Sequence, residues 1–214
     1  MSTEASNKEV ILVHGLWYGP WTLRRLEKAL SEQGYATRKF KYAPTSDCLD
    51  NHAANLHAFA RDTDAGEQHF LGHSLGGLLI LRMLADDHDI VPGRVLLLGT
   101  PLRGSVTARK IRRLPLSGVL LGEVRDVLED GFSSLPPGRE TGMIAGSRGF
   151  GLGMLTGGVG GPGDGTVGLD ETDTEGLKDR IVLPVTHSGM LFSTEVVSQS
   201  VQFMNSGGFL RGAS

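Results

Sequence analysis

Short apolar runs alternate along the chain with segments in which apolar residues recur every three or four positions. Runs rich in branched apolar residues predict buried strands, and the longer spacing predicts amphipathic helices. We therefore expect strands over residues 10–13, 36–42, 69–72, 94–99, 143–145 and 180–185. Helices are expected over residues 21–33, 50–62, 75–84 and 187–205.

This alternation predicts an α/β fold with a mainly parallel sheet of about six strands and helices on both faces. Residues 36–42 carry several charges, so this strand is expected near the edge of the sheet. The many glycines between Gly142 and Gly168 predict a long irregular loop. Because no linker and no repeat of fixed period divides the chain, residues 1–214 are expected to form a single domain.

Composition narrows the class of protein. The 214 residues are 39% hydrophobic and 21% charged, which is typical of a soluble globular protein. The net charge of −3 disfavours a nucleic-acid partner, and Cys48, the only cysteine, excludes an intrachain disulfide. No secretory signal follows the polar first nine residues, and no apolar run is long enough to span a bilayer, so a cytoplasmic location is expected.

The stretch GHSLGG, residues 72–77, lies between a predicted strand and a predicted helix. In that context G-x-S-x-G forms a nucleophile elbow, a turn so sharp that it needs small residues on both sides of the serine. The hydroxyl of Ser74 would be exposed above the sheet, and the amide of Leu75 could stabilise an oxyanion. A chance match in a glycine-rich chain is the alternative, which Gly77 and the flanking elements disfavour.

A serine nucleophile needs a general base, and two histidines are candidates. His187 is the only histidine after His88, and it follows the last predicted strand, where a loop can bring it above Ser74. His73 adjoins the serine, but neighbours on a tight turn point in different directions. We therefore expect His73 to line or support the site. The competing interpretation of His187 is a surface histidine before a helix.

The base in turn needs a carboxylate to hold its tautomer. Asp164 is the leading candidate, because the glycines around it in GGPGDGTVG leave its side chain free to reach inward. Asp170, Glu171 and Asp173 compete with it. They fall in an acidic stretch that is typical of a solvated surface.

A second oxyanion donor is expected after the first strand, in VHGLWYGPW. There Gly15 permits a turn and the amide of Leu16 can face the site. The aromatic residues that follow, Trp17, Tyr18 and Trp21, could wall an acyl or aryl pocket, or could pack the loop onto the core.

The segment between Arg103 and Arg113 contains five basic residues and no acidic one. Apolar residues in and after it are Ile111, Leu114, Leu116 and Val119. This pattern predicts either a small amphipathic lid that makes weak contact with a membrane or lipid surface, or simply a solvated helix face.

No cofactor and no metal are expected. His52 and His57 are five residues apart, which is a poor spacing for two ligands on one helical face. The chain also lacks the fingerprints of dinucleotide and phosphate-loop sites.

The chain resembles the α/β-hydrolase superfamily, specifically small bacterial lipase- and esterase-like members related to GPI-inositol-deacylase-like lipases. The resemblance rests on VHGLW, GHSLGG, GTPLRGS, GDGTV and PVTHSGML, and it covers most of the chain. It implies a catalytic triad with two oxyanion donors: Ser74, Asp164 and His187, with Leu16 and Leu75. The first two antiparallel strands of larger lipases are not evident, and the length leaves room for a minimal cap or none.

These features together predict a serine hydrolase that cleaves small-molecule carboxylic esters through an acyl-enzyme. A thioesterase or an acyltransferase could use the same triad. A catalytically silent α/β-hydrolase that serves as a scaffold or binding protein is an alternative of a different class. The oligomeric state is left open.

Overall fold

The computed structural model describes residues 7–85, 89–115, 117–132, 134–151 and 159–211, and these form one six-stranded sheet in the order β2-β1-β3-β4-β5-β6. The strands are β1 (Lys8–Val13), β2 (Ala36–Phe40), β3 (Glu67–His73), β4 (Val95–Leu98), β5 (Thr141–Gly146) and β6 (Asp179–Leu183). Every neighbouring pair is parallel. The predicted α/β fold with a parallel sheet is confirmed.

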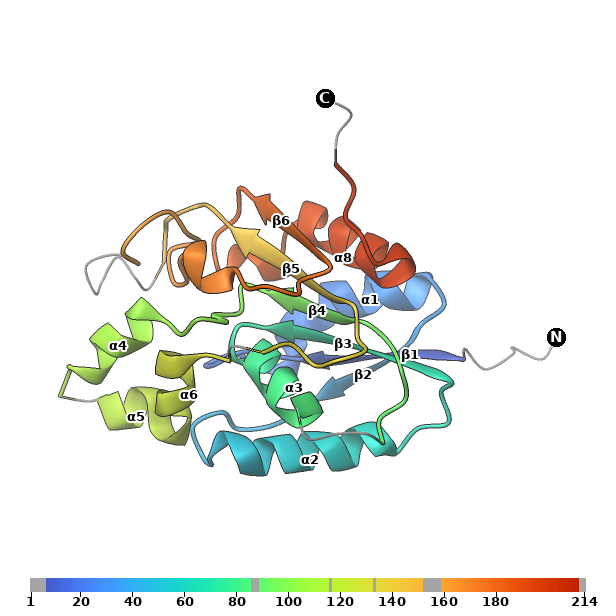
Figure 1. Ribbon diagram of the computed structural model, residues 1–214, viewed down its shortest axis with the longest axis horizontal. Helices are drawn as coiled ribbons and strands as arrows, with labels where there is room; N and C mark the ends of the chain where they lie inside the picture. The colour runs from blue at the N-terminus through green and yellow to red at the C-terminus, as the bar shows by residue number, and fades with distance from the viewer. Residues whose placement is uncertain (1–6, 86–88, 116, 133, 152–158, 212–214) are drawn as a thin grey trace.

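Helices cover both faces of this sheet (Figure 1). The α-helices of the described residues are α1 (Arg24–Glu32), α2 (Leu49–Arg61), α3 (Leu75–Ala85), α4 (Val106–Arg112), α5 (Ser117–Leu121), α6 (Arg125–Asp130) and α8 (Thr194–Ser206). Helices α1 and α8 lie on one face, and α2 and α3 on the other. Among the described residues, no helix combines the length and apolar character needed to cross a bilayer.

The alternation of side chains along β1 shows how the two layers are filled. Val10 and Leu12 belong to the core cluster that packs against α1 and α8, whereas Ile11 and Val13 belong to the cluster beneath α2 and α3. All four side chains are fully buried. A central parallel strand that is apolar on both faces is the result expected when helices cover both sides of a sheet.

A small cap lies beyond the carboxyl ends of the strands, between β4 and β5 (Figure 1). It consists of α4, α5, the 3-10 turn η2 (Gly122–Val124) and α6. The expectation of a minimal cap agrees with this arrangement. Strand β2 lies at the sheet edge, as its charges predicted, and there Lys39 pairs with Glu27 at 2.5 Å.

Two boundaries differ from the sequence-based expectations. The last helix begins at Thr194 rather than at residue 187, because Ser193 accepts a hydrogen bond from the Val196 amide and caps it there. The fifth strand, expected over residues 143–145, spans Thr141–Gly146 and so includes the first glycines of the stretch in which a loop was expected. Glycine is needed in this strand because a Cβ at Gly142 would lie 2.4 Å from the ring of Phe203.

Candidate active site

Ser74 occupies the one-residue turn between β3 and α3. Its φ of +55° lies in the left-handed region, which is disfavoured for residues other than glycine and is often found at functional sites. The backbone holds it there: the Ser74 amide donates to the carbonyl of Leu98 at 2.8 Å, and its carbonyl accepts from the Gly77 amide at 3.0 Å. The serine is therefore fixed at the carboxyl end of a central strand.

The glycines of the elbow are required by close backbone contacts. A Cβ at Gly76 would lie 2.4 Å from the carbonyl oxygen of Val13, and one at Gly72 would lie 2.6 Å from the Cα of Gly77. Both distances are too short for any side chain. The G-x-S-x-G spacing thus follows from how tightly α3 starts against β1 and β3.

Two backbone amides are available beside the Ser74 hydroxyl. Leu16 lies in the loop after β1 and lines the pocket into which Ser74 opens, and Leu75 is the first residue of α3. In the described part of the chain, neither amide donates a hydrogen bond. A Cβ at Gly15 would lie 3.0 Å from the Cβ of Ser74, so the Leu16 loop packs directly on the elbow. Such unpaired donors can stabilise a developing negative charge on oxygen.

His187 and Asp164 form a buried pair. Nδ1 of His187 lies 2.7 Å from Oδ2 of Asp164, and the His187 amide donates to the Asp164 carbonyl at 3.0 Å. The other carboxylate oxygen, Oδ1, accepts from the amides of Thr166 at 2.9 Å and Val167 at 2.7 Å. Because a carboxylate accepts, the imidazole proton is on Nδ1, and Nε2 is left with a free lone pair.

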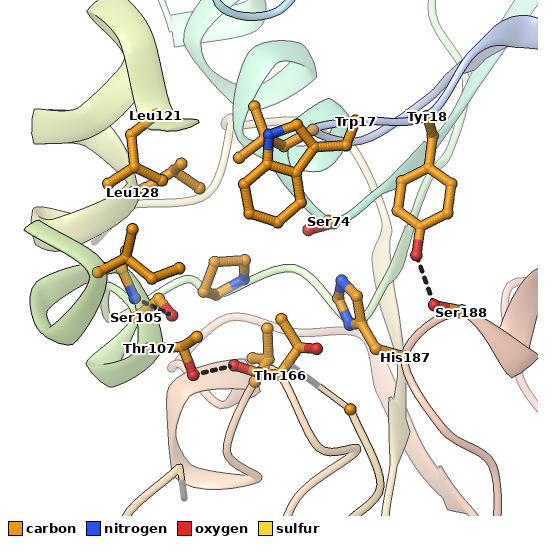
Figure 2. Close-up of a pocket in the computed structure, with 16 residues that line it drawn as sticks. Trp17, Tyr18, Ser74, Ser105, Thr107, Leu121, Leu128, Thr166, His187 and Ser188 are labelled. Atoms are coloured by element: carbon orange, nitrogen blue, oxygen red, sulfur yellow. Dashed lines mark hydrogen bonds between the residues drawn. The ribbon is translucent and has the colours of Figure 1, made fainter. Parts of the chain in front are cut away.

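Ser74 and His187 line the same pocket, and Figure 2 shows the His187 ring on the side of the pocket where Ser74 lies. Within the described residues they make no hydrogen bond to each other. Contacts of this kind are often long before substrate binds. Transfer of a proton from the serine to Nε2 requires the two groups to come within hydrogen-bond distance.

His73 lies behind the site and is fully buried. Its Nε2 donates to the carbonyl of His187 at 3.1 Å, and the centroids of the two rings are 4.7 Å apart. Burial, followed by the nearby His187 ring, holds the pKa of His73 well below its usual value. A neutral His73 can support the loop of His187 without placing a second positive charge beside it.

Buried histidines predict that the fold weakens in acid. Burial lowers the pKa of His69 to about 4, and burial also lowers the pKa values of His14 and His73. An unfolded chain protonates these rings near pH 6.5. Since the unfolded state then binds more protons, the free energy of unfolding should decrease as the pH falls from about 6.5 toward 4. Urea denaturation at pH 7.5, 6.0 and 5.0 measures this, and a constant value across the series would contradict it.

The pocket above Ser74 has a volume of about 260 Å³. Of the aromatic residues after Leu16, Trp17 and Tyr18 line it, whereas Trp21 does not and is 71% exposed. The Tyr18 hydroxyl lies 2.6 Å from the hydroxyl of Ser188 (Figure 2). The indole N–H of Trp17 donates to the carbonyl of Leu120 at 2.9 Å, which connects the Leu16 loop to the cap.

The cap forms the apolar wall of the pocket, and of its lining residues the sequence analysis named only Ile111, as part of a possible amphipathic lid. The lining residues of the cap are Thr107, Ala108, Ile111, Leu121 and Leu128. Their segment carries many charges, and only its position over the carboxyl ends of the strands shows that its apolar side faces Ser74. Helix α4 begins after the sequence GTPLRGS, where Ser105 caps it by accepting from the Ala108 amide.

The basic segment of the cap is partly neutralised by α6. Arg109 donates to the carbonyl of Glu129, and Arg112 pairs with the Glu129 carboxylate at 2.8 Å. Val119 is 78% exposed and Leu114 is exposed, while Leu116 lies outside the described residues. The cap therefore presents apolar side chains to solvent with less positive charge than the sequence suggested.

The acidic stretch after Asp164 is not uniformly solvated, and for Glu171 that interpretation was wrong. Asp170 and Asp173 are exposed, but Glu171 is only 7% exposed and accepts two backbone hydrogen bonds. Asp164 is the carboxylate brought to His187. Among the described residues, no group of three or more His, Cys, Asp or Glu side chains is arranged to hold a metal ion.

The fold and this pocket define an α/β hydrolase. Residues 10–159 match the model of the alpha/beta hydrolase family, which is more than half of the chain. The chain belongs to this family.

Solved structures of the same fold include lipases and esterases. A Bacillus licheniformis lipase, BlEst2 in mature form, is 19% identical with a TM-score of 0.77, and the match covers 94% of this chain and 92% of that one. The metagenomic carboxyl esterase MGS0156 is 17% identical with a TM-score of 0.67, covering 86% and 65%. A lipase-esterase related protein from Clostridium acetobutylicum is 13% identical with a TM-score of 0.61, covering 93% and 95%. Comparison with curated protein sequences gives no match.

Proposed function

We propose that this protein is a serine hydrolase that cleaves small carboxylic esters through Ser74, His187 and Asp164. The observation that carries the proposal is the buried 2.7 Å contact between His187 and Asp164 in the wall of a pocket that also holds Ser74 on a left-handed turn. A catalytically silent scaffold of this fold would have no need for a serine in that strained position.

In the acylation step, Nε2 of His187 takes the proton of Ser74 as the serine oxygen attacks the ester carbonyl carbon. The carbonyl oxygen becomes negative and is stabilised by the amides of Leu16 and Leu75. Asp164 stabilises the imidazolium without itself becoming protonated. When the bond between carbon and the leaving oxygen breaks, His187 gives its proton to that oxygen, and the alcohol departs.

Deacylation repeats these steps with water. His187 takes a proton from the water molecule, whose oxygen attacks the acyl carbon. The second tetrahedral oxyanion uses the same two amides. Collapse releases the carboxylic acid, and His187 returns the proton to Ser74. No metal or cofactor is required by this sequence of steps.

The shape of the pocket favours short to medium acyl chains. Its apolar wall is built by the cap, and the volume of about 260 Å³ is small for a ligand pocket. Trp17 and Tyr18, from the loop after β1, also line the pocket, and Trp17 contacts the cap through the carbonyl of Leu120.

We expect turnover of soluble p-nitrophenyl esters to be highest for short or medium chains and to fall for long ones. Ala108→Leu, which fills the apolar wall, should lower kcat/KM for medium chains relative to acetate by at least about tenfold. Val119→Leu is the matched control, because Val119 is on the cap but 78% exposed. Strong activation by anionic lipid vesicles, with little turnover of soluble esters, would instead support the lipid-surface contact and contradict this preference.

A fluorophosphonate probe tests the proposed chemistry before any substrate is known. Covalent labelling at Ser74, found by peptide mass spectrometry, is expected for a serine hydrolase and not for a scaffold. Parallel assays with an acyl ester and the matching acyl thioester then separate an esterase from a thioesterase. Failure to label Ser74 in the folded protein would contradict the proposal.

A further inference from the structure

The carboxylate of Glu171 is buried between two segments of the proposed site. It lies in the 3-10 turn η3 (Asp170–Thr172) and is 7% exposed. Its Oε1 accepts from the Val106 amide at 2.6 Å, and its Oε2 accepts from the Gly168 amide at 2.9 Å. Among the described residues, no lysine or arginine nitrogen lies within 4.0 Å of it. A buried carboxylate is costly unless its hydrogen bonds are well formed.

The two amides that donate to Glu171 belong to two different segments, helix α4 and the loop that carries Asp164. Val106 is the first residue of α4, the helix whose Ala108 and Ile111 side chains line the pocket. Gly168 closes the acid loop, residues 163–168, where its backbone pairs with that of Gly163.

The acid loop is also the segment that holds Asp164. Its Thr166 and Val167 amides donate to Asp164 Oδ1, and the Thr166 carbonyl accepts from the hydroxyl of Thr107 in α4 at 2.7 Å (Figure 2). The carboxylate of Glu171 and the hydroxyl of Thr107 are thus two separate ties between the acid loop and α4.

We infer that Glu171 is a positioning residue of the proposed reaction. Its carboxylate fixes the position of the acid loop, which carries Asp164, relative to α4, which lines the pocket. Hydrogen bonds to a charged acceptor are shorter and stronger than neutral ones, so a carboxylate fixes both segments more firmly than an amide would. The geometry of the contact between Asp164 and His187 then depends on Glu171, although Glu171 touches neither substrate nor base. This inference rests on the proposed function.

Glu171→Gln tests the inference, because the amide group keeps the shape but replaces one acceptor oxygen with a donor. We expect kcat for a short soluble ester to fall by about tenfold or more, with a smaller change in KM. Asp173→Asn is the matched control, since Asp173 lies in the same acidic stretch but is exposed. It should leave kcat unchanged.

The low-field proton resonance of the hydrogen bond between His187 and Asp164 gives a second readout that needs no turnover. It should shift or broaden in Glu171→Gln and stay unchanged in Asp173→Asn. A Glu171→Gln protein that is merely less stable, with wild-type kcat and an unchanged resonance, would overturn the inference.

Thr107→Val removes the other hydrogen bond between α4 and the acid loop, the one from the Thr107 hydroxyl to the Thr166 carbonyl. This variant tests the inference if Glu171→Gln does not fold. It should also lower kcat and move the resonance, and an unchanged kcat and resonance would overturn the inference. In the double variant the effects on kcat should be non-additive, because both residues act on one junction. If wild-type protein fails to react with the fluorophosphonate probe, the proposed function fails, while the resonance still tests the positioning role.

Discussion

Ser74→Ala is expected to abolish both fluorophosphonate labelling and ester turnover. Removing the nucleophile of a serine protease lowers kcat by roughly 10⁶-fold, and no other hydroxyl shares the elbow here. The fold should persist, because Ser74 is held by its backbone bonds to Leu98 and Gly77 rather than by its side chain. The comparison requires kcat/KM for one soluble ester and circular dichroism spectra of both proteins.

Ser188→Ala is the matched control for this variant. Ser188 also lines the pocket, where its hydroxyl lies 2.6 Å from that of Tyr18, but it is not on the elbow. It should change the rate by less than about tenfold, the scale of one neutral hydrogen bond. Labelling that persists on another serine in Ser74→Ala would show that the nucleophile is wrongly assigned.

The elbow could be predicted from the sequence because all of its determinants are consecutive. The strand, the glycines, Ser74 and the apolar helix follow one another within residues 67–85, and the steric need for Gly72 and Gly76 arises from that local turn. The parallel sheet was similarly predictable, since parallel sheets with helices on both faces require nearly continuous apolar strands.

The cap wall and Glu171 could not be predicted in the same way. The environment of Glu171 is set by the start of α4, and the contact joins residues 65 positions apart. Trp17 and Leu120 meet across 103 positions. An acidic run such as residues 170–173 has the composition of a solvated surface, and only the packing of a distant helix decides which of its carboxylates is buried.

The pairing of Asp164 with His187 could be predicted from the sequence only in part. The chain order and the surrounding glycines favoured Asp164, but the sequence contained no direct evidence that its carboxylate turns inward. In the structure Gly99 makes room for the pair: a Cβ there would lie 3.1 Å from both Asp164 Oδ2 and His187 Nδ1. That requirement comes from the end of β4 and is not visible in GGPGDGTVG.

Asp164→Asn is the second change with a large expected effect. The amides of Thr166 and Val167 both donate to Oδ1, so an asparagine side chain must keep its oxygen there and turn its NH₂ toward Nδ1 of His187. Nδ1 would then have to accept, which places the proton on Nε2 and leaves no lone pair for the hydroxyl of Ser74.

The equivalent change in a serine protease lowers kcat by about 10⁴-fold, or roughly 5 kcal/mol at about 1.36 kcal/mol per decade. We expect a loss of that order in Asp164→Asn, measured as kcat/KM on one soluble ester after each variant is shown to be folded. Asp170→Asn and Asp173→Asn should each change the rate by less than about tenfold, because both side chains are exposed. If Asp170→Asn or Asp173→Asn loses most of its kcat/KM while Asp164→Asn stays close to the wild-type value, the acid of the triad is wrongly assigned. Ser74 and His187 would survive that result, since their assignment rests on the elbow and the shared pocket.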